Sequence, residues 1–104
     1  MARVGGNVVR HVVLFRWKPE ADAASKGRVA EGLSELPSAI PEIRHYAFGP
    51  DAGLAEGNFD FAVVADFDDV DGYRLYAAHP AHTALIAERI RPLIADRVAV
   101  QYET

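Results

Sequence analysis

Val8-Val9-Arg10-His11-Val12-Val13-Leu14-Phe15-Arg16-Trp17 is the stretch of sequence that decides the fold. β-Branched and aromatic residues dominate it, which is typical of a β-strand, and Lys18-Pro19 ends it. Side chains alternate between the two faces of a strand. In this stretch both alternating sets are apolar in the middle. A sheet built on such a strand needs a cover on each of its two faces.

A second stretch, residues 59–67, has the same character. Its odd positions are all apolar, and Ala62 and Val64 make its even positions apolar at the centre. Two strands of this kind lie well apart in the sequence. The first and third strands of the chain are therefore both expected to be apolar on two faces.

The remaining elements follow from apolar periodicity and from helix-ending residues. Pro37 and Pro41 bracket a turn after the first helix, and residues 49–58 form a glycine-rich loop. The expected order is a strand at 8–17, a helix at 21–36, strands at 42–48 and 59–67, a short helix ending near 78, a helix from Pro80 to near Ala95, and a strand at 97–103. This order predicts an α+β, ferredoxin-like βαββαβ fold with a four-stranded antiparallel sheet.

The helices of such a fold cover one face of the sheet, and this chain has no element left for the other face. The simplest second cover is the sheet of another copy, related by a twofold axis. We therefore expect a homodimer whose sheets close into a dimeric α/β barrel. Its centre is predicted at Val12, Leu14, Ala62 and Val64.

Length and composition limit the classes of function. The chain has 104 residues, which predicts one domain over 8–104 after a flexible lead-in at 1–7. Its net charge of −4 comes with no basic run, so we expect no nucleic-acid partner. No apolar stretch reaches 18 residues, so we expect no membrane partner. There is no cysteine, which fits a cytoplasmic protein and excludes thiolate chemistry.

Tyr76-Ala77-Ala78-His79-Pro80-Ala81-His82 is the stretch most suggestive of chemistry. Proline favours the first position of a helix, so His79 falls at the N-cap and His82 at the third helical position. The positive end of the helix dipole disfavours a charged imidazole there. A neutral imidazole beside a phenol can move a proton, which makes His82 and Tyr76 candidate acid–base residues.

Each of these residues also has a purely structural interpretation. His82 and Tyr76 would then bond a neighbour inside the core, and His11 would be a core histidine on an apolar strand face. A metal site at His79 and His82 is not expected, because no cysteine or carboxylate lies beside them in the sequence. Asp66, Asp68, Asp69 and Asp71 lack the EF-hand spacing and are expected to end strands and cap helices.

The chain resembles the stress-responsive dimeric α/β-barrel (Dabb) family from about Val8 to Tyr102. The matching residues are Arg10-His11-Val12-Val13-Leu14-Phe15, the segment from Leu36-Pro37 to Ile40-Pro41, and Tyr76 with His79-Pro80-Ala81-His82. The resemblance implies a ferredoxin-like homodimer, and most members of the family have no assigned reaction. One plant member, olivetolic acid cyclase, has catalytic residues that match Tyr76 and His82.

That enzyme also has a pocket histidine that matches His11, but its other pocket residues differ. Its third-strand histidine falls at Phe61, and its helix-one aromatics fall among Val29, Ala30 and Leu33. The resemblance therefore implies the proton-moving pair without the cyclase's substrate. We expect a pocket between sheet and helices that holds a small apolar or carbonyl compound, without a cofactor. Its expected lining is His11, Val13, Val29, Leu33, Phe61, Val63, His79 and Ile86.

Three functions remain open at this point. The first is a cofactor-independent enzyme of the cyclase, lyase or isomerase kind. The second is a non-enzymatic stress-response protein that sequesters a ligand. The third, implied by related dimeric α/β barrels, is a monooxygenase or a haem-handling protein in which His82 is a candidate iron ligand.

Overall fold

The computed structural model describes residues 7–104. Strand β1 (Val9–Trp17) lies at the centre of a four-stranded antiparallel sheet of order β2-β3-β1-β4. Its neighbours are β3 (Phe61–Phe67) and β4 (Ile94–Glu103), and β2 (Ile43–Pro50) pairs with the far side of β3. The two strands that are apolar on both faces therefore lie side by side at the centre of the sheet, and the predicted ferredoxin-like fold is confirmed.

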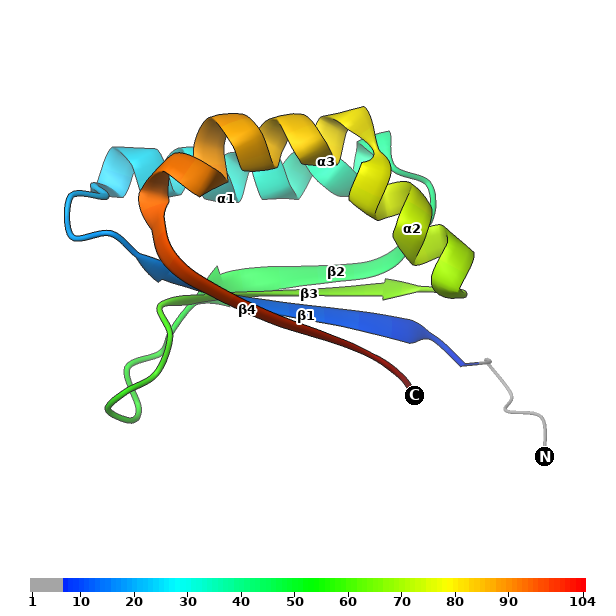
Figure 1. Ribbon diagram of the computed structural model, residues 1–104, viewed down its shortest axis with the longest axis horizontal. Helices are drawn as coiled ribbons and strands as arrows, with labels where there is room; N and C mark the ends of the chain where they lie inside the picture. Colours follow the sequence, from blue (N-terminus) through cyan, green and yellow to red (C-terminus); the bar gives the residue numbers. More distant parts are fainter. Residues whose placement is uncertain (1–6) are drawn as a thin grey trace.

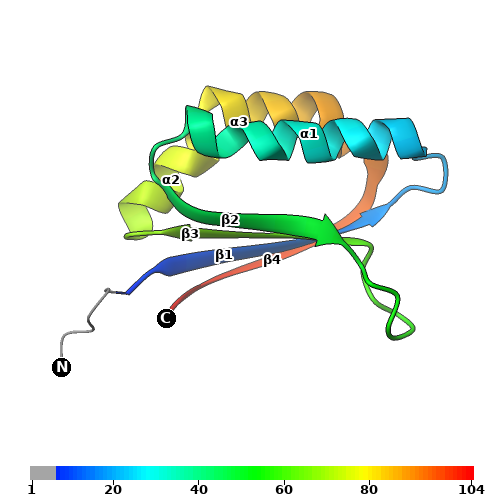
Figure 2. The ribbon, with the colours of Figure 1, turned by 180° about the vertical axis from the view of Figure 1, so that it is seen from behind.

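The helices lie on one face of this sheet (Figures 1 and 2). Helices α1 (Ala23–Ala39) and α3 (Pro80–Leu85) lie above the strands, and α2 (Val70–Ala78) leads from the end of β3 into α3. Asp22 caps α1 by accepting a hydrogen bond from the Ser25 amide at 2.8 Å. The core lies between the two layers.

The first helix is longer than expected, because Pro37 lies inside it instead of ending it. A proline in a helix lacks its own amide hydrogen, so one backbone bond is lost there. The next turn still closes, since the Ile40 amide donates to the Leu36 carbonyl at 2.9 Å. Other boundaries shift as well: the helix begins at Ala23, β2 runs on to Pro50, and β3 begins at Phe61.

The helix that begins at Pro80 ends differently from the prediction. Its α-helical part stops at Leu85, a π-helical turn covers Ile86–Ile90, and a 3₁₀ turn covers Arg91–Leu93. Pro92 cannot donate the hydrogen bond that would continue an α-helix. The backbone therefore changes pitch before the proline and enters β4 at Ile94, so Ala95 belongs to the strand.

The sheet face opposite the helices is the outer apolar face, which we define as Val12, Leu14, Ala62, Val64, Val98 and Val100. Strand pairing places Val12 between Val64 and Val100, and Leu14 between Ala62 and Val98. In a single copy of the chain Val98 is 47% exposed and Val100 is 55% exposed. The residues expected at the centre of a dimer therefore share one apolar surface.

Arg10 and Asp66 lie beside this surface as a two-bond ion pair, with Nε to Oδ1 at 2.7 Å and Nη2 to Oδ2 at 2.9 Å. Among residues 7–104 no helix is both long enough and apolar enough to cross a membrane. The lead-in expected at 1–7 lies outside the described residues, apart from Asn7.

Candidate functional site

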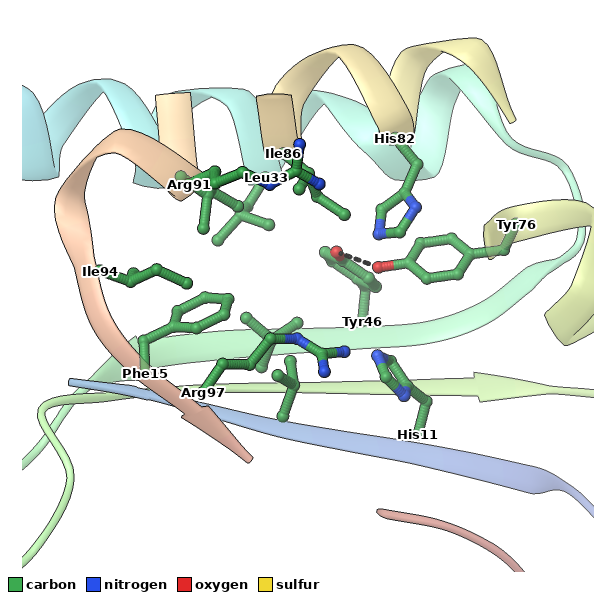
Figure 3. A pocket seen from close by; sticks show the side chains of 13 residues that line it. His11, Phe15, Leu33, Tyr46, Tyr76, His82, Ile86, Arg91, Ile94 and Arg97 are labelled. Carbon is green, nitrogen blue, oxygen red and sulfur yellow. Dashed lines mark hydrogen bonds between the residues drawn. The ribbon is translucent and has the colours of Figure 1, made fainter. Parts of the chain in front are cut away.

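A pocket of about 300 Å³ lies between the sheet and the helices (Figure 3). This volume is at the low end of the range for sites that hold small organic molecules. The pocket opens toward β4, whose inward-facing side chains are exposed. Seven residues predicted from the sequence line it: His11, Val13, Leu33, Val63, Tyr76, His82 and Ile86.

Three other predicted residues do not line this pocket. Val29 and Phe61 are buried in the core cluster instead. His79 caps α3, and its Nδ1 accepts a hydrogen bond from the Ala81 amide at 3.1 Å. This contact holds the His79 ring at the start of α3, so the ring does not line the cavity.

His82 lies at the third position of α3, as predicted from the preference of proline for the first helical position. Its ring points into the pocket (Figure 3). Its Nδ1 lies 3.2 Å from the Ala77 carbonyl oxygen. A carbonyl only accepts, so in this contact Nδ1 carries the proton and Nε2 keeps its lone pair. Burial lowers the pKa of His82, the charge of Arg97 adds to this, and the Ala77 carbonyl partly opposes it. His82 is therefore suited to accept a proton at Nε2.

Tyr76 reaches the same place from α2. Its ring centroid is 4.1 Å from that of His82, and its hydroxyl lies 3.0 Å from the Tyr46 hydroxyl (Figure 3). Burial raises the pKa of Tyr76 to about 12, and the hydrogen bond with Tyr46 opposes the rise. Burial also raises the pKa of Tyr46. The two phenols are thus neutral, and either hydroxyl can donate to the other.

His11 approaches from the sheet, with its ring centroid 6.0 Å from that of Tyr76. The Gln101 side-chain nitrogen lies 2.8 Å from His11 Nδ1. An amide nitrogen only donates, so in this orientation of Gln101 the His11 proton is on Nε2. Burial lowers the pKa of His11 to about 4, with further contributions from Arg97 and His82. Two neutral histidines therefore face the pocket with opposite roles, one as a donor and one as an acceptor.

Six lining residues were not predicted from the sequence: Phe15, Tyr46, Ile90, Arg91, Ile94 and Arg97. Phe15 lies on the same face of its strand as His11 and Val13, so the alternation of side chains alone could have predicted it. Ile90 shares the helical stripe of His82 and Ile86. For Arg91 and Ile94 no signal exists, because their position depends on the π and 3₁₀ turns.

Within the described 98-residue span no group of three or more histidines, aspartates or glutamates could hold a metal ion. The aspartates near the end of β3 have other roles. Asp66 pairs with Arg10, Asp68 pairs with Arg44, and Asp69 caps α2 through the Gly72 amide at 2.8 Å.

Comparison with known proteins places this chain in a family. The family model described as "Stress responsive A/B Barrel Domain" (Dabb) matches residues 9–104. A curated relative, a stress-response A/B barrel domain-containing protein of Arabidopsis thaliana, is 24% identical over 96 residues. That match covers 91% of this chain and 36% of the relative, so the chain spans about a third of the relative's length.

Solved structures share the fold. A dimeric ferredoxin-like protein of unknown function from Thermobifida fusca YX is 51% identical, with a TM-score of 0.88 over 98% of this chain and 95% of that one. A similar dimeric protein from Bacteroides fragilis NCTC 9343 is 28% identical, with a TM-score of 0.77 over 93% of this chain and 96% of that one.

Hydroxynitrile lyase from Passiflora edulis is 21% identical, with a TM-score of 0.83 over 93% of each chain, a likeness that concerns the fold. The family model matches nearly the whole described chain, and this match shows the family as well as the fold. The chain belongs to the stress-responsive A/B barrel (Dabb) family.

Proposed function

We propose that this Dabb protein binds a small apolar carbonyl compound in the pocket between sheet and helices and moves a proton on it with His82 and Tyr76. The observation that carries the proposal is the setting of His82. Its Nδ1 is held by the Ala77 carbonyl, which leaves Nε2 as a base inside an apolar pocket. His11, Val13, Leu33, Val63 and Ile86 supply the rest of the proposed binding surface.

The proposed step is proton abstraction from the carbon next to the carbonyl group. Nε2 of His82 takes the proton, and the two electrons of the C–H bond move to form an enol double bond. The Tyr76 hydroxyl gives its proton to the carbonyl oxygen, and Tyr46 supports it by donating to Tyr76. Positioned acid–base groups of this kind contribute about 10²–10⁴ in rate. The pKa shifts fit the roles, because a neutral imidazole accepts and a neutral phenol donates.

We also propose that the protein is a homodimer joined through the outer apolar face. Two observations support this. The face carries a continuous row of apolar side chains across the sheet, and the Thermobifida fusca relative at 51% identity is described as dimeric. Burying apolar surface stabilises by about 25 cal/mol per Å². The pocket lies on the other side of the sheet, so each copy would keep its own.

A second candidate function is sequestration of a ligand without turnover. It is favoured by the fact that both histidines already have protein partners, as structural histidines do. The two functions differ in whether bound carbonyl compounds exchange protons with solvent.

Solvent exchange of a model ketone tests the proposed chemistry. Wild-type protein in D₂O should catalyse deuterium uptake next to the carbonyl of 4-phenyl-2-butanone, followed by NMR. His82→Gln should reduce the rate by about 100-fold or more, because glutamine cannot take the proton. His45→Gln is the matched control, since His45 is exposed on β2 and does not line the pocket. Binding of the ketone without exchange would support sequestration, and exchange that survives in His82→Gln would overturn the role of His82.

A further inference from the structure

The charges around the pocket are unbalanced. Two of its lining residues are arginines, Arg91 and Arg97, and among residues 7–104 no aspartate or glutamate lines it. This is unexpected in a chain that has 15 acidic and 11 basic residues. The pocket therefore concentrates positive charge in a protein that is negative overall.

The two arginines also lack carboxylate partners elsewhere. Arg10, Arg16 and Arg44 each form an ion pair with an aspartate. Within residues 7–104, Arg91 and Arg97 form no ion pair and no side-chain hydrogen bond. Both residues are exposed.

Their positions place one cation on each wall of the pocket. Arg97 extends from β4 along the sheet toward His11, and Arg91 extends from the 3₁₀ turn along the helical wall near Ile86 (Figure 3). Arg97 lies opposite Phe15 in the sheet, on the inward face. An anion between the two guanidinium groups would lie at the open side of the pocket, with its apolar part directed inward.

We infer that the ligand of this pocket is an apolar carboxylate whose acid group lies between Arg91 and Arg97 while its carbonyl-bearing part lies at His82 and Tyr76. The inference rests on the proposed function and adds the substrate class. A planar guanidinium group matches a carboxylate through two parallel hydrogen bonds. The inner wall is apolar, from Val13, Leu33 and Val63, and the volume of about 300 Å³ suits a small molecule with a single acid group.

The influence of Arg97 on its neighbours agrees with this placement. Its charge contributes to the lowered pKa of both His11 and His82. It also acts to lower the pKa of Tyr76, although burial outweighs it. The guanidinium group of Arg97 therefore acts on His11, Tyr76 and His82, so a carboxylate bound to it would lie near the reacting groups.

Two probes of equal shape test the inference. 3-Phenylpropanoate and 3-phenylpropanamide differ in charge and share the same apolar part. Titration calorimetry with wild-type protein should give a Kd at least about tenfold lower for the carboxylate. Arg97→Gln and Arg91→Gln should each remove most of this preference, while leaving amide binding within about twofold. Arg74→Gln is the charge-matched control, because Arg74 is exposed on α2 and outside the pocket.

Several results would overturn the inference. These are equal binding of the two probes, no saturable binding of the carboxylate at millimolar concentration, or an equal loss in Arg74→Gln. Tighter binding of phenyl phosphate than of 3-phenylpropanoate would replace the carboxylate by a phosphate ester. Dissociation of a dimer by Arg97→Gln in light scattering would assign Arg97 to an interface. His82→Gln separates the two proposals. Carboxylate binding should survive this change, which tests the inference, and proton exchange should be lost, which tests the proposed function.

Discussion

The imidazole of His82 lies against the phenol of Tyr76, with ring centroids 4.1 Å apart and planes tilted by 35°. The two residues come from different helices, α3 and α2, and Tyr46 joins them from β2 through a 3.0 Å contact between hydroxyl oxygens. Three separate elements therefore fix the position of one proton-transfer group. A change in any one of the three side chains should be measurable at the other two.

Tyr46→Phe should weaken this arrangement without filling or emptying the pocket. The Tyr76 hydroxyl would lose its partner inside a largely buried site, at a cost of about 1 kcal/mol in the free energy of unfolding. The pKa of Tyr76 should rise further, because the bond to Tyr46 acts to lower it. Proton exchange of 4-phenyl-2-butanone should slow, with its Kd unchanged.

Tyr73→Phe is the control for Tyr46→Phe. Tyr73 packs against His11, with ring centroids 5.2 Å apart, but it does not line the pocket. Urea unfolding and exchange rates of the two variants should therefore differ clearly. If Tyr46→Phe matched the wild type in both measurements, the contact between the phenols would have no energetic role.

Stability should fall in mild acid because of His11. The unfolded chain protonates this histidine near pH 6.5, whereas the folded protein keeps it neutral down to about pH 4 because it is buried. Between these values the unfolded state binds more protons, so the free energy of unfolding falls as the pH drops from about 6.5 to 4 and levels off below that. The lowered pKa of His82 acts in the same direction.

Urea unfolding of the wild type and of His11→Gln at pH 7.5 and pH 5 measures this contribution. Glutamine cannot protonate, so the variant should lose less stability between the two pH values, by on the order of 1 kcal/mol. The comparison is made within each protein, and a uniform loss of stability in the variant does not affect it. An identical pH dependence in both proteins would show that His11 is not neutral in the folded state.

The sequence was sufficient for the fold and for part of the site. Alternation in residues 8–17 and 59–67 identified two strands, and the rule for proline at a helix start placed His79 and His82 correctly. These are local signals, set by neighbours along the chain. Helix ends were predicted less well. Whether a helix continues past Pro37 or Pro92 depends on which backbone hydrogen bonds the next turn can still form.

The residues missed at the pocket depend on pairing between distant segments. Tyr46 faces the site because β2 pairs with β3 so that Tyr46 lies opposite Ala65, and Ala65 lies opposite His11. Arg97 faces it because β4 pairs with β1 in a register that places it opposite Phe15. A single sequence shows which residues of a strand share a face, but it does not show the register between strands.

Two glycines of α1 should respond in opposite ways to alanine. A Cβ at Gly32 would collide with Leu85 Cδ1 and lie 3.2 Å from Arg89 Nη1, whereas a Cβ at Gly27 would meet nothing within 4 Å. Alanine is favoured over glycine inside a helix by about 0.8–1.0 kcal/mol. Gly27→Ala should therefore raise the free energy of unfolding by about that amount.

Gly32→Ala should lower it by about 1–3 kcal/mol, the usual cost of overpacking, because buried Leu85 must move where α1 crosses α3. Chemical denaturation of both variants checks the pair. A stabilised Gly32→Ala protein would mean that α1 and α3 can separate without cost. If the collision occurs, Leu85→Ala should cost less stability in the Gly32→Ala background than in the wild type, and an equal cost in both would contradict it.

The outer apolar face supplies the last prediction. Val64→Asp places a carboxylate at the centre of the proposed interface, and Val100→Asp places one at a side chain that is already 55% exposed in a single copy. A charge facing an apolar partner surface is costly to bury. Both variants should therefore shift the protein from two 11.3 kDa chains to one in light scattering at micromolar concentration. Val100→Asp should leave the fold of the single chain intact, since more than half of this residue is exposed in a single copy. Leu75→Asp is the control, because Leu75 is 56% exposed on α2, on the helical side of the sheet. It should remain dimeric. A dimer that survives both Val64→Asp and Val100→Asp must use another surface, and the outer apolar face would then need a different partner.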